Sequence, residues 1–254
     1  MRGAYIMKKT LSSIVLASAL LFGAMAPVTA NAAETDVTPS TGSTTGSITF
    51  TKPASTTEPV DPSNPDKPGG NTDDNGGAKP GSDADLTFLY VSPSMDFGSN
   101  IVNQTTASKT QMYNPKTITT TAFPTGTTDT NKLVTEVSDT RGTNAGWNVS
   151  VGSTELKAGD DVISGAQLNL AGDNATIKNS ADSVATGQAA NLTTGGDVAT
   201  IYDAKTGIGA GATAMQLNPS DIVLTNIPAN VKATEAGTTY TATLNWTLNN
   251  TPAE

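Results

Sequence analysis

Neighbouring carboxylates are the side chains whose type and spacing come closest to a catalytic pattern, and they occur at Asp73-Asp74 and Asp160-Asp161. A glycosidase needs two carboxyl groups on opposite sides of a cleft, whereas side chains adjacent on a strand or turn diverge. The 254 residues include no His and no Cys, which excludes Ser-His-Asp triads, Cys-His dyads and metal sites built on those ligands. The sequence therefore predicts a protein that is not an enzyme and carries no cofactor.

Two glycine-containing segments resemble ligand-binding loops but lack the context that such loops need. Asp73-Asp74-Asn75-Gly76 lacks the alternating ligands and the distal Glu of an EF-hand. The glycine-rich segment 207–211 precedes no predicted helix, so we interpret it as a flexible loop and not as a nucleotide site. We predict no metal site; weak Ca²⁺ binding by acidic surface turns is the alternative.

The two tryptophans, Trp147 and Trp246, are the main candidates for ligand contact. Aromatic faces offer large, rigid contact surfaces, and Trp is enriched among interface anchors. Trp246 shares a predicted strand face with leucines, so we expect it to be buried in the core. Trp147 follows the glycine-containing turn 142–146, and both a buried and a partly exposed position are open for it.

Strands position these residues, and the clearest of them spans residues 240–248. Its apolar and polar side chains alternate, which a pleated strand sends to opposite faces. One face is therefore predicted to be buried, and the register is strongly specified. The apolar set is Tyr240, Ala242, Leu244, Trp246 and Leu248, and Gly237 and Pro252 bound the strand.

The composition favours strands over helices in the rest of the chain as well. It includes 43 threonines, which are β-branched, and 38 Gly and Pro residues, while only 15% of residues are charged. Many short apolar runs separated by turn residues predict an all-β domain, a single β-sandwich or barrel. The further predicted strands are 86–91, 109–113, 117–123, 133–138, 147–151, 166–170, 175–178, 198–202 and 222–224.

The first 32 residues have the layout of a secretory signal peptide. Arg2, Lys8 and Lys9 precede an apolar run from Leu11 to about residue 26, and small residues at 30 and 32 form a cleavage site. The run is short against the ~20 apolar residues of a membrane span. We therefore predict a secreted protein cleaved after Ala32, with no membrane insertion after cleavage.

Residues 33–83 differ in composition from the residues that follow. Seven of the fourteen prolines and seven glycines lie between Pro39 and Gly81, which favours extended or flexible chain. We predict a disordered tether over 33–83 and a folded domain over 84–254. The tether contains one β-prone island, residues 47–51, which either adds to a sheet edge of this domain or of a partner, or has no partner.

The charge balance excludes two classes of partner. The formal net charge is −9, and removal of residues 1–32 leaves 11 basic against 23 acidic residues, a net charge of −12. An acidic chain without a basic patch is a poor binder of nucleic acid or of an anionic membrane. We expect neither partner.

The last predicted strand carries a motif with a known family resemblance. Tyr240-xxx-Leu244-x-Trp246-x-Leu248-xxx-Pro252 resembles the distal motif of the WxL-domain surface proteins of low-GC Gram-positive bacteria. A proximal counterpart starts at Val137 and includes Arg141 and Trp147, with Val149 where the family usually has Leu. The segment that opens the predicted domain, Val91-Ser-Pro93-xxx-Phe97-Gly98, also resembles the family's domain start.

The resemblance implies a location, a ligand and partners. It implies non-covalent binding to peptidoglycan at the cell wall, and a surface complex with other proteins encoded beside WxL proteins, including WxL-binding partners. An adhesin for a host protein or an external glycan is the alternative. The chain is similar to the short form, in which the WxL domain is nearly the whole mature protein. Arg141 then pairs either with Asp139 or with a wall carboxylate. Our candidate binding residues are the motif positions Arg141, Trp147, Tyr240, Leu244, Trp246, Leu248 and Pro252.

Overall fold

The computed structural model describes residues 41–123, 130–234 and 236–253. The chain divides into two units, residues 1–48 and residues 49–254. The described residues of the first unit, 41–48, form no helix or strand and are exposed. The predicted signal peptide lies outside the described residues. No helix in the described ranges is long and apolar enough to span a membrane.

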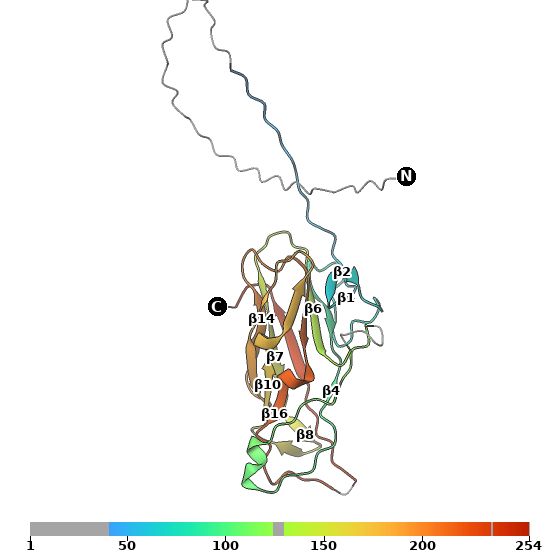
Figure 1. Cartoon of the computed structure of the whole chain (residues 1–254), viewed down its shortest axis with the longest axis vertical. Coiled ribbons are helices and arrows are strands. Elements are labelled where there is room, and N and C mark those ends of the chain that lie inside the picture. Colours follow the sequence, from blue (N-terminus) through green and yellow to red (C-terminus); the bar gives the residue numbers. More distant parts are fainter. Residues whose placement is uncertain (1–40, 124–129, 235, 254) are drawn as a thin grey trace, which may run out of the picture. The chain divides into compact units, whose positions relative to one another are not determined.

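The second unit is built from antiparallel sheets, which confirms the predicted all-β class (Figure 1). One four-stranded sheet has the order β11-β15-β6-β3, and the other has the order β12-β14-β7-β17. The first contains β11 (Thr176–Asn179), β15 (Gly211–Leu217), β6 (Leu133–Asp139) and β3 (Leu86–Val91). The second contains β12 (Thr186–Gly187), β14 (Ala199–Ala204), β7 (Trp147–Ser153) and β17 (Leu244–Asn249).

A third sheet and several short elements complete the unit. The third sheet has the order β13-β10-β16. Its strands are β13 (Ala189–Thr193), β10 (Gln167–Ala171) and β16 (Ile222–Thr225). The two-stranded pairs are β1 (Val60–Asp61) with β2 (Asn64–Pro68), β4 (Met95–Asp96) with β5 (Thr117–Ile118), and β8 (Leu156–Ala158) with β9 (Asp161–Ile163). Three 3₁₀ helices, η1 (Thr106–Thr110), η2 (Gly172–Asn174) and η3 (Pro219–Asp221), are the only described helices.

One hydrophobic core joins the three larger sheets. The inward side chains of β6 and β7 alternate along each strand, as period-two sequence patterning requires. They pack with buried residues of β10, β13, β14, β15 and β16 in one cluster. Every residue of β6 and β7 is buried, so these two strands form the centre of the domain.

The second half of the predicted tether is ordered, which departs from the prediction of disorder over 33–83. Strands β1 and β2 form a hairpin beside β6 and contact β15 (Figure 1). The main-chain N–H of Val60 donates to Oε2 of the fully buried Glu136, at 3.0 Å. Pro59, Pro62 and Pro65 are buried. Proline is usually confined to sheet edges because it has no N–H, but its ring is apolar, and here that ring is used for packing.

The β-prone island, residues 47–51, is not part of any strand in the structure. Its two large apolar side chains are exposed to solvent, Ile48 by 76% and Phe50 by 83%. Lys52, the first residue after the island, forms an ion pair with Asp85, and its Nζ lies 2.7 Å from Oδ1.

Candidate functional site

Trp147 is a core residue. Its side chain is 0% exposed, and its Nε1 donates to the carbonyl oxygen of Gly209 at 3.0 Å. The indole meets the Tyr202 ring edge to face, with centroids 5.6 Å apart. The buried alternative is therefore the correct one for Trp147, which cannot contact a ligand in this conformation.

Trp246 packs against the hydrophobic core, as expected, but it is only half-buried. The predicted alternation is confirmed over residues 244–248, since Leu244, Trp246 and Leu248 are half-buried while Asn245 and Thr247 are exposed. The strand begins at Leu244 and not at residue 240, and Ala242, which we expected on the buried face, is exposed. The burial of Trp246 is incomplete because β17 is the last strand of its sheet and pairs only with β7 among the described strands. An edge strand has a neighbouring strand on one side only, so the side chains of its apolar face are left partly uncovered on the other side.

A cleft of about 750 Å³ lies along the exposed side of Trp246. Its walls come from the edge strand of each four-stranded sheet, with Leu86 and Phe88 on β3 and Trp246 and Leu248 on β17. The cleft combines apolar surface with amide, hydroxyl and cationic groups, and none of its lining residues is acidic. The remaining lining residues are Lys79, Thr87, Arg141, Thr247, Asn249 and Asn250.

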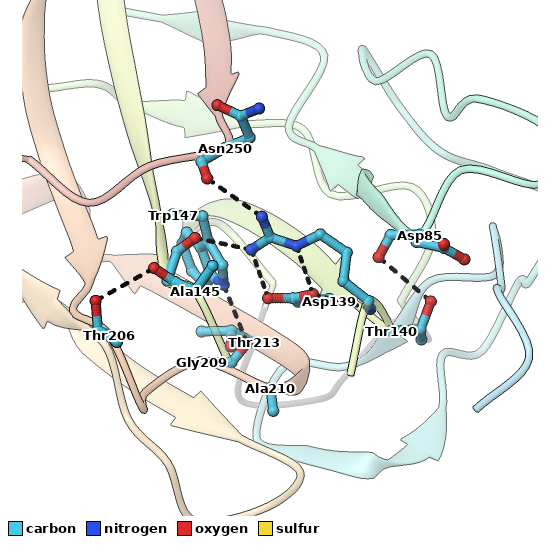
Figure 2. A network of polar contacts seen from close by, with 12 residues as sticks. Asp85, Asp139, Thr140, Ala145, Trp147, Thr206, Gly209, Ala210, Thr213 and Asn250 are labelled. Carbon is cyan, nitrogen blue, oxygen red and sulfur yellow. Dashed lines mark hydrogen bonds and ion pairs between the residues drawn. The ribbon is translucent and has the colours of Figure 1, made fainter. Parts of the chain in front are cut away.

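Arg141 lines the cleft, and its guanidinium is hydrogen-bonded to groups of the protein. Its Nε and Nη2 donate to the two carboxylate oxygens of Asp139 at 2.9 and 2.8 Å, and Nη2 also donates to the carbonyl of Gly146 at 2.7 Å. Its Nη1 donates to the carbonyl of Asn250 at 3.2 Å. Two of these acceptors, Asp139 and Asn250, are labelled in Figure 2, where dashed lines mark their hydrogen bonds. The Asp139 contact raises the pKa of Arg141. Of the two expected pairings, the one with Asp139 is observed.

The other motif residues lie outside the cleft lining. The Tyr240 hydroxyl donates to the carbonyl of Lys232 at 3.1 Å, and Tyr240 precedes β17 instead of opening it. Pro252 packs against Gly146, where an added Cβ would come within 2.8 Å of Pro252 Cγ. Leu244 packs against the core from β17. These positions serve the packing of the chain around the two motif segments.

An amide cluster fixes the end of β17. Asn249 Nδ2 donates to Asn148 Oδ1 at 2.8 Å, and Asn148 Nδ2 donates to the carbonyl of Thr251 at 2.8 Å. Together with the Arg141 contact, these bonds tie the segment after β17 to the start of β7. The polar side of β17 is thus held in place while Trp246 faces the cleft.

Of the candidate binding residues, the cleft brings together Arg141, Trp246 and Leu248. Sequence reasoning missed Lys79, Phe88 and Asn250. Leu86 and Phe88 were placed correctly on a strand, but nothing in the pattern indicated that this strand is an edge facing β17. Lys79 lies within the predicted tether, where the sequence gives no indication of a site.

The WxL family model, described as WxL domain surface cell wall-binding, matches residues 37–252. The chain belongs to the WxL family, which confirms the resemblance noted from its motifs. It is a cell-surface protein with a cell-wall-binding domain. No curated protein and no solved structure matches the chain.

Proposed function

We propose that the protein binds peptidoglycan non-covalently through the cleft between β3 and β17. The observation that carries this proposal is the half-buried side chain of Trp246, which lines one wall of that cleft. An aromatic face offers a rigid, amphipathic platform at a low cost in conformational entropy. A sugar ring presents a flat C–H face to such a platform.

Polar groups around Trp246 suit the rest of a glycan ligand. Thr247 and Asn250 are exposed and line the cleft, so their hydroxyl and amide groups are accessible to sugar hydroxyl and acetamido groups. Lys79 makes no ion pair among the described residues and supplies one cation. The absence of acidic residues from the lining matters because the mature chain is strongly acidic elsewhere.

Within this proposal, Arg141 is a positioning residue. The four hydrogen bonds of its guanidinium are to groups of the protein, so it orients the end of β17 instead of binding a wall carboxylate. We also propose that the protein acts without catalysis and as part of a multi-protein surface complex. The exposed apolar side chains of Ile48 and Phe50 support the second of these points.

Co-sedimentation with purified peptidoglycan sacculi, freed of protein and secondary polymers, tests the proposed site. Trp246→Ala is expected to weaken binding roughly tenfold or more, as for an anchor residue, while Trp246→Phe keeps most of it. Ile101→Ala is the matched control, because Ile101 is 92% exposed and lies outside the cleft lining. Unchanged binding by Trp246→Ala would place the wall contact elsewhere on the domain.

A further inference from the structure

β17 is an edge strand without the usual protection. Natural sheet edges carry charges, prolines or bulges that prevent pairing with another chain. The six residues of β17, Leu-Asn-Trp-Thr-Leu-Asn, include no charge and no proline, and the pairing with β7 runs without a register shift. The opposite edge of the same sheet, β12, has only two residues.

The backbone register shows which groups of β17 point outward. The Thr154 N–H donates to the Thr243 carbonyl at 2.9 Å, in the register that continues along β17. In an antiparallel pair, hydrogen-bonded positions alternate with non-bonded ones. The N–H and C=O groups of Leu244, Trp246 and Leu248 therefore point away from β7, toward the open side.

The edge strand on the other side of the cleft, β3, has part of its edge covered by another segment of the chain. Its end is covered by an ordered segment, since Gly77 N–H donates to the Val91 carbonyl at 2.8 Å and Val91 N–H donates to the Asn75 carbonyl at 3.3 Å. Asn75 Nδ2 also donates to the Leu89 carbonyl at 2.7 Å. No described segment covers β17 in this way. The open edge of β17 can therefore pair with a further strand, which would lie beside the apolar wall of the cleft.

The chain also carries a matching strand donor, residues 47–51. This segment, Ser-Ile-Thr-Phe-Thr, alternates polar and apolar residues, so an extended conformation sends Ile48 and Phe50 to one face. Both side chains are exposed, and the segment pairs with none of the described strands. Residues 41–51 contain no charge that would oppose pairing.

We propose that residues 47–51 of a second copy of this chain add as a strand to the open edge of β17. The backbone groups of Leu244, Trp246 and Leu248 hydrogen-bond the incoming strand, and its Ile48 and Phe50 side chains pack on the apolar wall of the cleft. Charge favours this occupant, because residues 33–51 contain Glu34 and Asp36 and no Lys or Arg, whereas the cleft lining has Lys79, which makes no ion pair among the described residues, and no acidic residue. The contact is heterologous and links copies into rings or open chains.

This inference goes beyond the proposed function and limits it. An added strand beside β17 covers Trp246, so assembly and wall binding through that cleft exclude each other on one copy. Only five residues pair, so we expect weak association, with a dissociation constant of about 0.1–1 mM. Such an affinity becomes effective where many copies are concentrated on one surface.

Analytical ultracentrifugation of the mature chain, residues 33–254, tests the assembly. The expected result is a mass that rises with concentration, and a combined Ile48→Asp and Phe50→Asp variant should associate at least tenfold more weakly. A Thr44→Asp and Thr45→Asp variant is the matched control, because it adds the same charge to the same exposed segment and should associate like the wild type. A monomer at about 1 mM, or equal association by both variants, would overturn the proposal.

Disulfide trapping identifies the acceptor and the copy that supplies the strand. The chain has no cysteine, so introduced pairs are the only ones that form. A Thr49→Cys chain mixed with a Thr247→Cys or Asn245→Cys chain should give an intermolecular disulfide, since these side chains lie on the polar face of the strands. The control partner is Lys178→Cys on β11, an edge strand of the other sheet. Trapping by β11 alone would overturn the proposal, as would an exclusively intramolecular disulfide in a Thr49→Cys and Thr247→Cys double variant. Because neither experiment uses sacculi, their outcome is separate from that of the wall-binding test.

Discussion

Arg141 and Asn250 are joined by a hydrogen bond of 3.2 Å between the guanidinium Nη1 and a main-chain carbonyl, across 109 residues of sequence. The bond connects the turn before β7 to the residue that follows β17. The same guanidinium forms an ion pair with Asp139, whose side chain is 3% exposed. The two WxL motif segments are therefore one structural unit, and the arginine orients the strand that presents Trp246.

Arg141→Lys should destabilise the domain by about 1–3 kcal/mol, because an ammonium cannot reproduce the planar set of donors to Asp139, Gly146 and Asn250. Urea unfolding at neutral pH measures this effect. Lys52→Gln serves as the control, since it removes an ion pair whose lysine side chain is 54% exposed and should cost less than about 1 kcal/mol. Equal small effects of the two changes would show that the Arg141 network contributes little.

Gly209→Ala should destabilise the domain more than Gly207→Ala. Both glycines have positive φ, +82° and +87°, so both substitutions carry backbone strain. At Gly209 an added Cβ would also lie 2.7 Å from Trp147 Nε1, whereas at Gly207 it would meet nothing within 4 Å. Thermal unfolding of the two variants should differ by several degrees. Equal melting temperatures would contradict the close contact between Gly209 and Trp147.

Stability should fall as the pH rises above about 10. Burial, the main cause, and the nearby Glu136 charge raise the pKa of Tyr202, while the Thr135 hydrogen bond lowers it. The folded state thus holds this proton more tightly than the unfolded state, where the pKa is about 10. The contribution is complete below that pH and declines above it.

Tyr202→Phe separates this titration from packing. The variant should start about 1 kcal/mol less stable at pH 8, because Thr135 loses the phenol as its hydrogen-bond acceptor. Its free energy of unfolding should then fall less steeply above pH 10 than that of the wild type, by up to about 1.4 kcal/mol per pH unit. Denaturant unfolding between pH 8 and pH 11 gives both slopes, and parallel slopes would rule out this role of Tyr202.

Wall binding should survive added salt. Residues 33–254 have a net charge of −12, so attraction to an anionic wall is not the driving force for binding, and screening by salt removes repulsion instead. We expect sacculus binding to hold or strengthen between about 10 and 150 mM salt. A steep loss over this range would mean that a basic site such as Lys79 dominates the contact.

The fold class and several central strands are predictable from the sequence, and period-two patterning is strong in β7 and β17. The central strand β15 is not, since its first residue, Gly211, ends a glycine-rich segment that suggests a loop. The hairpin of β1 and β2 is missed for a similar reason. Its prolines indicate an extended chain, and only the folded domain reveals the surface on which they pack.

The two tryptophans show why the site is harder to predict than the fold. The alternating pattern of β17 correctly predicts an apolar face, but an apolar face has no sequence mark that distinguishes an edge strand from a central one. Trp147 follows a turn, which suggests exposure, yet β7 lies between two neighbours and is covered on both faces. Burial at these positions depends on strand order, which is a property of the whole sheet.

Tryptophan fluorescence during titration with soluble peptidoglycan fragments tests most directly whether Trp246 contacts the wall. The chain has two tryptophans, so the Trp246→Phe variant reports on the buried Trp147 alone. We predict a shift in emission on binding for the wild type and none for Trp246→Phe. The same shift in both proteins would show that ligand binding does not take place at Trp246 and would contradict the proposed site.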